Sequence, residues 1–361
     1  MINNKLIVGI TPGDGNGIGY EVIIKSFADE RILDMCTPVI YGSSKIFGFY
    51  KKNIHNISQI ATNVITSAKD YHPKRVNIVN CLPDNVFVEP GQPTAESSKS
   101  AMKSLEVAVQ DLKEGNIDVL VTAPINKMAM VKEGFGYTGH TDYLAKEFGV
   151  DEVSMIMVCG NFKVGTVTAH IPLSKVAENI TEERILMKLR MMNASLKRDF
   201  GIPYPKIAVL GLNPHSGDSG LVGDEEINII IPAIQKANEE GIMAFGPFSP
   251  DGFFGMGKHT KFDLTLGMYH DQCLTPFKAM AFDMGVNFTA GLPIVRTSPD
   301  HGAAYEMAGR DIADPRSFLS SIYTAIDVYN NRALYDELEA NKVTVKAPDV
   351  EIRPRGGKVI E

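Results

Sequence analysis

The chain has 361 residues, which is long enough to bury a large core and exceeds the usual size of one domain, so we expect two domains. Its 36 Lys and Arg and 43 Asp and Glu give a net charge of −7 without a basic block, which argues against a nucleic-acid partner but not against a small phosphorylated molecule. No apolar run reaches the length of a transmembrane helix, and the first residues lack the pattern of a signal peptide, so we expect no membrane partner and a cytoplasmic location.

Short β-branched runs alternate with helical patterns, which is typical of an α/β fold with a largely parallel sheet. In chain order, the expected strands are 6–10, 117–122, 154–159, 164–168, 207–212 and 264–268. Two helices show apolar residues at helical spacing. The first carries Ala101, Leu105, Ala108 and Leu112 and ends near Gly115; the second has Thr181 as its N-cap and carries Ile185, Leu189, Met192, Leu196 and Phe200. The stretch 53–93 has weak periodicity and is predicted to be irregular, and the last twenty residues are predicted to form a solvated tail with room for one strand.

The first expected strand runs into a glycine-rich turn, residues 11–19 (TPGDGNGIG), which precedes a helix. This order is similar to a nucleotide-binding loop, but the spacing does not match G-x-G-x-x-G and the turn lacks the lysine of a P-loop. A purely structural turn, rich in positive-φ positions, is therefore the alternative.

Four cysteines are spread along the chain, at Cys36, Cys81, Cys159 and Cys273. None forms a C-x-x-C pair, and each lies near apolar residues, so we predict buried free thiols in a reducing compartment.

Histidines carry most of the chemical signal. Five of the eight lie in Gly/Pro-punctuated segments at strand ends, at His140, His170, His215, His270 and His301. His170, His215 and His270 each follow a hydrophobic strand by one to three residues, and ligands gather at the carboxyl ends of strands in open α/β sheets. Three neutral imidazoles suit a divalent ion with open positions for substrate. The alternative is that each is a hydrogen-bonded loop histidine.

A second group of residues favours anion binding. Lys278, Asn287 and Arg296 stand in an otherwise apolar, Gly-rich segment, where an arginine fork can bind phosphate or carboxylate, although snorkelling or surface ion pairing would explain them equally. His140 and Thr141 precede a helical run from Asp142, and a helix N-terminus is itself an anion site. Simple N-capping by a neighbouring threonine, Thr138 or Thr141, is the alternative there.

Ten short motifs follow one another along nearly the whole chain: ITPG (10–13), GIG (17–19), TAPINK (122–127), TGHT (138–141), AHIPL (169–173), GLNPH (211–215), YHDQ (269–272), GVN (285–287), GLP (291–293) and RTS (296–298). Through them the sequence resembles the 4-hydroxythreonine-4-phosphate dehydrogenase family of pyridoxal phosphate biosynthesis. The sequence departs from the family pattern in the stretch Asp14-Gly15-Asn16, at Cys273 and at Gly252.

The resemblance implies a two-domain isocitrate/isopropylmalate dehydrogenase-like α/β fold, with mostly parallel sheets and a cleft between the domains. We expect residues 1–127 and 297–361 to form the first, discontinuous domain on the cofactor side, and residues 128–296 to form the second, with the metal and the dimer interface.

The resemblance also implies roles for individual residues. It assigns one divalent ion (Zn, Mg or Co) to His170, His215 and His270, and the phosphorylated substrate to His140, Thr141, Lys278, Asn287 and Arg296. It implies a homodimer with its active site at the interface and metal ligands from both chains. The segment 300–309 is similar to the adenosine-binding loop of isocitrate dehydrogenases, which places NAD or NADP at Asp300, His301, Gly302, Ala303, Glu306 and Gly309.

The implied reaction is NAD-dependent oxidation of 4-phosphohydroxy-L-threonine to a β-keto acid, which decarboxylates to 3-amino-2-oxopropyl phosphate. The metal would lower the pKa of the substrate hydroxyl, and Lys278, His140 or Asp271 would take its proton. Two alternatives remain: a D-threonate or D-erythronate 4-phosphate dehydrogenase, and a catalytically inactive protein that binds phosphorylated metabolites.

Overall fold

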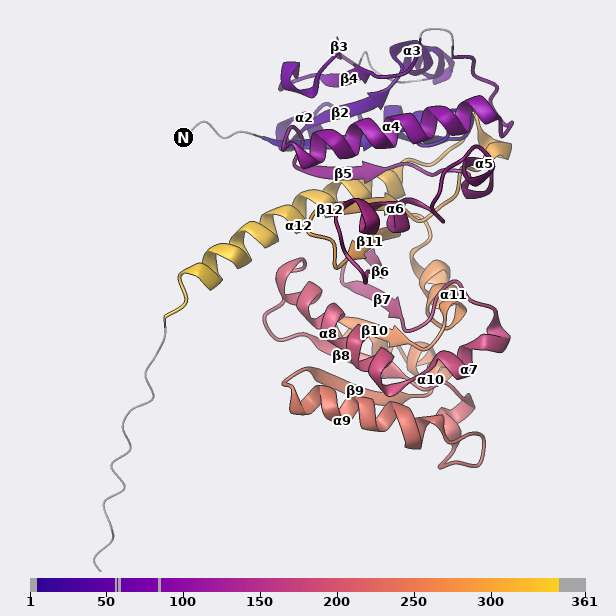
Figure 1. The fold of residues 1–361 in the computed structure, drawn as a ribbon, viewed down its shortest axis with the longest axis vertical. Helices are drawn as coiled ribbons and strands as arrows, with labels where there is room; N and C mark the ends of the chain where they lie inside the picture. Colours follow the sequence, from indigo (N-terminus) through magenta and orange to yellow (C-terminus); the bar gives the residue numbers. More distant parts are fainter. Residues whose placement is uncertain (1–4, 56, 58–59, 84–85, 344–361) are drawn as a thin grey trace, which may run out of the picture.

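One continuous sheet of twelve strands organises the protein in a computed structural model, which describes residues 5–55, 57, 60–83 and 86–343. The strand order is β3-β4-β2-β1-β5-β12-β11-β6-β7-β10-β8-β9. The strands are β1 (Leu6–Thr11), β2 (Cys36–Gly42), β3 (Thr62–Ile65), β4 (Val76–Asn80), β5 (Val119–Thr122), β6 (Ser154–Cys159), β7 (Phe162–Thr166), β8 (Lys206–Leu210), β9 (Met243–Phe248), β10 (Leu264–Gly267), β11 (Val286–Ala290) and β12 (Val295–Pro299). Figure 1 shows the strands from the first part of the chain at one end of the molecule and β8 and β9 at the other.

Helices cover both faces of this sheet (Figure 1). They are α1 (Gly19–Ser26), α2 (Ile32–Met35), α3 (Ser44–Asn53), α4 (Ala95–Lys113), α5 (Lys127–Lys132), α6 (His140–Glu147), α7 (Val176–Asn179), α8 (Glu182–Arg198), α9 (Ile231–Glu239), α10 (Pro250–Gly255), α11 (His270–Ala281) and α12 (Arg316–Ala340). None of the helices in the described ranges combines the length and apolar character needed to cross a membrane.

The sheet is parallel except near its middle, where β11 runs antiparallel to both neighbours, β12 and β6, and β6 runs antiparallel to β7. The predicted α/β class with a largely parallel sheet is confirmed. All six expected strands are present, with ends shifted by up to two residues.

Some local predictions were wrong. The stretch 53–93 is not irregular throughout, because it contains β3 and β4. The buried side chain of Asn77 interrupts the apolar pattern of β4, yet its amide donates to the carbonyls of Pro38, His72 and Arg75. Helix α8 has the expected N-cap, Thr181, which accepts from Arg184 N, but it ends at Arg198 and excludes Phe200. All but the first two of the last twenty residues lie outside the described part.

The four thiols are free, as predicted, although only Cys36 and Cys273 are fully buried. Burial raises the pKa of both thiols to about 12, so both are protonated and inert near neutral pH.

The glycine-rich turn after β1 is buried over its whole length. Within the turn only Gly13 has a positive φ, of 66°, so the prediction of many positive-φ positions was wrong. Gly17 and Gly19 are needed instead because neighbouring backbone atoms pack closely against them. A Cβ on Gly17 would lie 2.6 Å from the carbonyl oxygen of Ala303, and one on Gly19 would lie 2.0 Å from that of Pro12. The structural interpretation of this turn is therefore supported.

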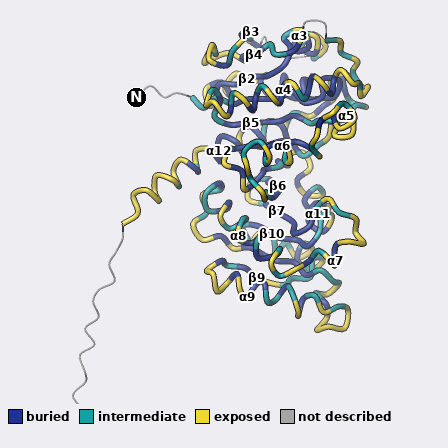
Figure 2. Tube along the Cα trace, viewed as in Figure 1, coloured by how far each residue is buried: buried dark blue, intermediate teal, exposed yellow. Residues whose placement is uncertain are grey.

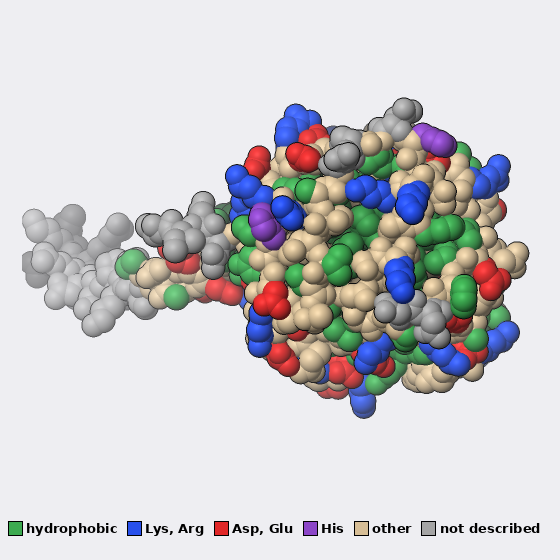
Figure 3. Space-filling view, turned by 90° about the horizontal axis from the view of Figure 1, so that it is seen from above, with side chains coloured by type: hydrophobic (Ala, Val, Ile, Leu, Met, Phe, Trp, Pro, Cys, Tyr) green, Lys and Arg blue, Asp and Glu red, His purple; other side chains and the backbone are tan. Residues whose placement is uncertain are grey.

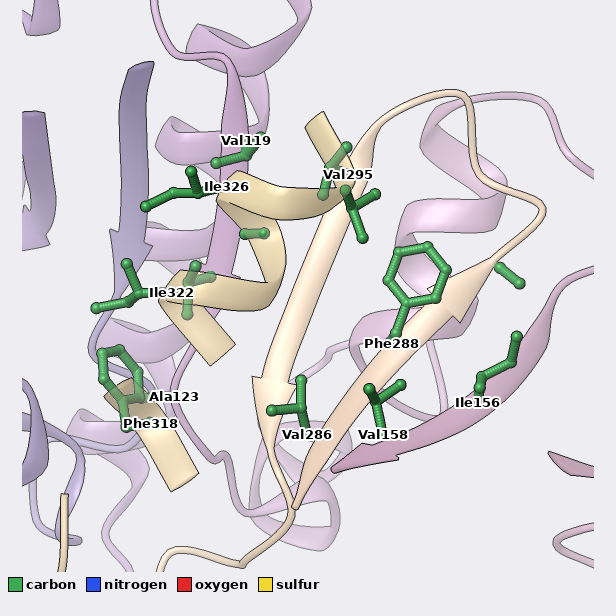
Figure 4. Packing of buried hydrophobic residues seen from close by; sticks show 14 of the residues in the cluster. Val119, Ala123, Ile156, Val158, Val286, Phe288, Val295, Phe318, Ile322 and Ile326 are labelled. Carbon is green, nitrogen blue, oxygen red and sulfur yellow. The ribbon is translucent and has the colours of Figure 1, made fainter. Parts of the chain in front are cut away.

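Helix α12 braces the middle of the sheet. Its apolar face, with Phe318, Ile322 and Ile326, packs on β5 and β12, and Figure 4 shows Ile326 beside Val119. Figure 2 shows the resulting pattern, with buried strands inside and exposed outer helix faces. The same helix reaches α8, where Arg332 Nε lies 2.6 Å from Asp199 Oδ1 and both side chains are under a tenth exposed.

We expect Arg332→Leu to lower the free energy of unfolding by about 3–5 kcal/mol, because the carboxylate of Asp199 would stay buried without its cation. The matched control is Arg198→Leu, which breaks the exposed Arg198–Asp336 pair on the same two helices and should cost about 0–1 kcal/mol. Urea unfolding of both variants measures the difference. Equal losses would contradict the importance of the buried pair.

Candidate functional site

A cavity of about 1070 Å³ opens beside the middle strands of the sheet. Five side chains expected to bind substrate all line it: His140, Thr141, Lys278, Asn287 and Arg296. His170 and the segment Asp300-His301-Gly302 line it as well. The structure thus brings together predicted site residues that lie far apart in the chain, from His140 to Gly302.

Arg296 on β12 lines the cavity and is only 4% exposed. Its Nε and Nη2 donate to Thr122 Oγ1 at 3.1 and 2.7 Å, and its Nη1 donates to Thr289 Oγ1 at 3.2 Å. Within the described ranges no carboxylate pairs with this guanidinium. Burial lowers its pKa to about 10, so it is still charged at neutral pH. A buried cation held only by hydroxyl groups is stabilised by an anion bound in the cavity.

His140 starts helix α6 beside Arg296. Burial, together with the nearby charges of Arg296 and Lys127, holds the pKa of its imidazole well below the usual value, so the ring is neutral at pH 7. The residue before it, Gly139, is the N-cap and has no side chain to cap the helix. The proposed capping by Thr138 or Thr141 was therefore wrong: the main-chain N–H of Thr138 instead donates to Asp142 Oδ2 at 2.9 Å. Helix α6 thus begins in the cavity lining without a side-chain cap.

Lys278 on α11 reaches Asp300, with 3.1 Å between Nζ and Oδ1. Burial raises the pKa of Asp300, and Lys278 opposes that effect. The other carboxylate oxygen, Asp300 Oδ2, is buried without a partner in the described structure, as is His301 Nε2. His301 Nδ1 lies 3.0 Å from the carbonyl oxygen of Gly302, which favours the tautomer that leaves Nε2 as an acceptor.

Two of the three predicted metal ligands lie next to each other. The ring centroids of His170 and His270 are 5.8 Å apart, and His270 Nδ1 lies 2.6 Å from Asp271 Oδ1. Burial, then the charges of Lys127 and His270, lower the pKa of His170 and keep it neutral, the form that binds metal. The third, His215, is exposed on a short 3-10 segment with a left-handed backbone (φ 54°). In the described part of one chain, no three or more His, Cys, Asp or Glu side chains form a cluster that could hold a metal ion.

The expected cofactor loop, 300–309, is tied to the glycine-rich turn after β1. The carbonyl of Ala303 accepts from Ile18 N at 3.0 Å, and Tyr305 Oη donates to Asp14 Oδ2 at 2.7 Å. Glu306 is exposed, and Gly309 packs near Pro90 with a φ of 73°.

Sequence reasoning assigned no role to several residues that build this site. Thr122 and Lys127 lie in the TAPINK motif and line the cavity, and Tyr305 ties the segment 300–309 to Asp14. The motif was the available signal, but threonine and lysine are too common for their types alone to indicate a site.

Comparisons with known proteins agree with the fold and the motifs. The family described as "Pyridoxal phosphate biosynthetic protein PdxA" matches residues 34–325. A 4-hydroxythreonine-4-phosphate dehydrogenase from Bacteroides thetaiotaomicron is 49% identical over 333 residues, covering 92% of this chain and 91% of the relative. A relative from Oceanobacillus iheyensis is provisionally named a D-threonate 4-phosphate dehydrogenase. It is 36% identical, and the alignment covers 91% of this chain and 99% of the relative. The crystal structure of a Klebsiella pneumoniae 4-hydroxythreonine-4-phosphate dehydrogenase aligns with a TM-score of 0.79 at 32% identity, over 90% of this chain and 100% of that one.

The neutral state of His140 predicts a pH effect on stability. Because its folded pKa is depressed, the unfolded chain binds a proton below about pH 6.5 that the folded protein resists, so stability falls as the pH falls through that value. The variant His140→Asn lacks this group. Relative to it, the wild type should lose about 1 kcal/mol of unfolding free energy between pH 7.5 and 5.5, measured by urea titration. If the difference in unfolding free energy between the two proteins is the same at pH 7.5 and 5.5, the prediction that His140 resists protonation in the folded protein is contradicted.

Proposed function

The chain belongs to the family of the pyridoxal phosphate biosynthetic protein PdxA, and we propose that it is a metal-dependent NAD(P) dehydrogenase that oxidises 4-phosphohydroxy-L-threonine. The named activity of its relatives supports the reaction, and the lining of the cavity supports the substrate class. The proposed product is a β-keto acid, which loses carbon dioxide to give 3-amino-2-oxopropyl phosphate. The four free thiols fit the cytoplasm as its location.

The observation that carries the proposal is the buried guanidinium of Arg296, which has no carboxylate partner in the described structure. A phosphate group would satisfy it by a bidentate contact and would also accept from the main-chain N–H groups at the start of α6. Thr141 and Asn287 supply further hydrogen-bonding side chains in the same lining.

The imidazoles present fit a divalent ion in part. His170 and His270, with ring centroids 5.8 Å apart, are close enough that both rings could hold one ion. Asp271 is placed to orient the ring of His270, as carboxylates commonly do for metal-bound histidines. We propose that the third ligand is His215 of the partner subunit in a homodimer, since His215 is exposed and is not a member of this pair.

When bound, the ion would supply Lewis acidity at the substrate hydroxyl, and the nicotinamide of NAD or NADP would accept the hydride. Arg296 and His140 would fix the phosphate, which sets the distance of the hydroxyl from the histidine pair.

His140 is neutral and can accept the hydroxyl proton. Lys278 borders the same space, but it is ion-paired with Asp300 and would have to lose its own proton before it could act as the base. Asp271 is a weaker candidate, because it is not part of the cavity lining and its carboxylate contacts the ring of His270, which itself also lies outside the lining.

For the cofactor, we propose the segment 300–309. His301 Nε2 is buried without a partner in the described structure and lies in the cavity wall, where it can accept a hydrogen bond from a ligand. We further propose two domains, residues 1–127 with 297–361 and residues 128–296, because the cavity lining is drawn from both.

The second candidate, a D-threonate or D-erythronate 4-phosphate dehydrogenase, is favoured by the Oceanobacillus iheyensis relative. It would use the same phosphate contacts and differ at the second carbon of the substrate. Side-by-side kcat/KM values for the two phosphorylated acids distinguish the candidates. A protein that binds both acids without forming NADH would instead be an inactive binding protein.

Arg296→Met should lower kcat/KM for 4-phosphohydroxy-L-threonine by at least about 30-fold, or about 2 kcal/mol, because a buried charge-assisted contact to phosphate is lost. The control Arg190→Met removes an exposed arginine on α8 that pairs with Glu240, and it should leave kcat/KM unchanged. NADH absorbance at saturating cofactor gives both values. Wild-type kcat/KM in Arg296→Met would contradict the phosphate assignment.

Subunit complementation tests the shared metal site. His170→Ala and His215→Ala should each be inactive alone. If they are unfolded and refolded together, half of the dimers pair the two variants and contain one intact site, so activity should recover to about a quarter of the wild-type value.

The matched control mixes His170→Ala with His270→Ala. These two ligands come from the same chain in our proposal, so no mixed dimer has an intact site and no activity should return. Recovery in the control, or none in the first mixture, would refute the assignment of His215 to the partner. Zinc, magnesium and cobalt added singly to the chelated wild type show which ion restores turnover.

A further inference from the structure

Four cations line the cavity, and they differ in how they are paired. Lys278 Nζ lies 3.1 Å from Asp300 Oδ1. Lys188 Nζ donates to the carbonyl of Val153 at 3.2 Å and lies 3.9 Å from Glu152 Oε2. Arg296 and Lys127 have no carboxylate within ion-pair distance in the described ranges. Lys127 is exposed, and its ammonium makes no hydrogen bond within those ranges.

Lys127 is the first residue of α5, and its side chain lies against the start of α6. A Cβ added to Gly139, the N-cap of α6, would meet Lys127 Cε at 3.3 Å and Cδ at 3.7 Å. The absence of a side chain at Gly139 leaves room for the lysine stem. The ammonium is thereby held beside the helix end that begins with His140.

Electrostatics gives the same position for the ammonium. After burial and Arg296, the charge of Lys127 is the next cause that lowers the pKa of His140, and after burial it is the next cause for His170. Lys127 therefore lies within electrostatic reach of both the phosphate-binding end of the cavity and the histidine pair.

A charge count indicates what such a cation is for. A phosphomonoester carries between about −1.5 and −2 charges at pH 7. Arg296 supplies one positive charge, His140 is neutral, and Lys188 and Lys278 have carboxylate neighbours. Between about half a negative charge and one negative charge is left over. After Arg296, Lys127 is the other cation of the lining that has no carboxylate within ion-pair distance in the described ranges.

We infer that Lys127 is the second cation of the phosphate site and gives the enzyme its preference for the dianionic form of a phosphomonoester. The inference rests on the proposed function only in taking the ligand to be phosphorylated. It assigns a binding role to a residue of the TAPINK motif, whose sequence alone indicated none.

Methyl phosphate binding to the full-length protein tests this directly, because it requires neither NAD, metal nor turnover. In isothermal titration at pH 7.5, Lys127→Met should weaken binding by about 10- to 100-fold, the loss expected for one charge-assisted contact. Lys127→Arg should retain most of the affinity. The matched control, Lys132→Met, removes an exposed lysine of the same helix outside the cavity and should bind as the wild type does.

A second readout is the preference for the dianion. The second pKa of a phosphomonoester is about 6, so the wild type should bind methyl phosphate more weakly at pH 5.5 than at 7.5. Lys127→Met should show a smaller pH effect, because the cation that discriminates the second charge is absent. An equal pH effect in the two proteins would overturn the inference.

Turnover separates binding from chemistry. With 4-phosphohydroxy-L-threonine, Lys127→Met should raise KM about 10- to 100-fold and change kcat by less than about threefold. A fall in kcat with unchanged KM would overturn the inference in favour of a role in the chemical step. A lower melting temperature that Lys127→Arg does not restore would overturn it in favour of a structural role.

The two proposals fail in distinguishable ways. If the protein binds methyl phosphate through Lys127 but forms no NADH, the dehydrogenase proposal fails and the phosphate site stands. If it turns over normally and Lys127→Met binds methyl phosphate as the wild type does, only the inference about Lys127 fails.

Discussion

The cavity is organised around one buried charge that the protein itself does not neutralise. An arginine is ionised at any ordinary pH, and removing it from water is costly unless its donors are satisfied. Here Thr122 and Thr289 supply neutral oxygen acceptors on the two strands that flank or face Arg296, namely β5 and β11. This arrangement keeps the guanidinium in place without cancelling its charge. That charge is therefore available to a ligand in the cavity.

The sheet explains how three strands come to meet at this point. Strand β12 returns late in the chain and lies parallel to β5, while β11 runs antiparallel beside it. Arg296 and Asn287 are thus close in space through strand pairing, and α12 packs behind β5 and β12 to hold them. On the face seen in Figure 3, by contrast, acidic and basic side chains are interspersed. The unpaired positive charge of Arg296 belongs to the cavity lining, because it depends on the burial of this side chain and on the lack of a carboxylate partner in the described structure.

The sequence was sufficient for strands with nearly continuous apolar runs, such as 6–10 (LIVGI) and 154–159 (SMIMVC). It was insufficient where polar residues are buried for structural reasons. In β4, Asn77 breaks the pattern although all its amide bonds are made inside the protein. In α12, Ser317 and Ser321 lie on the buried face because their hydroxyls donate to backbone carbonyls. Polar residues whose hydrogen bonds are made inside the protein interrupt the spacing of apolar residues on which the predictions relied. Strand β4 and helix α12 were therefore not predicted.

The site shows the same division. Isolated charges in an apolar segment and the family motifs predicted residues that do line one cavity. The charge states of these residues could not be predicted from the sequence. His140, for example, is neutral because it is buried and because cations surround it. The three predicted metal ligands do not form one cluster in the described part of the chain: His170 and His270 lie side by side, whereas His215 is exposed and is not a member of this pair. If the assembled pair of subunits completes the site, metal binding and dimer formation are linked, because the ion can be fully coordinated only by the dimer and therefore stabilises it.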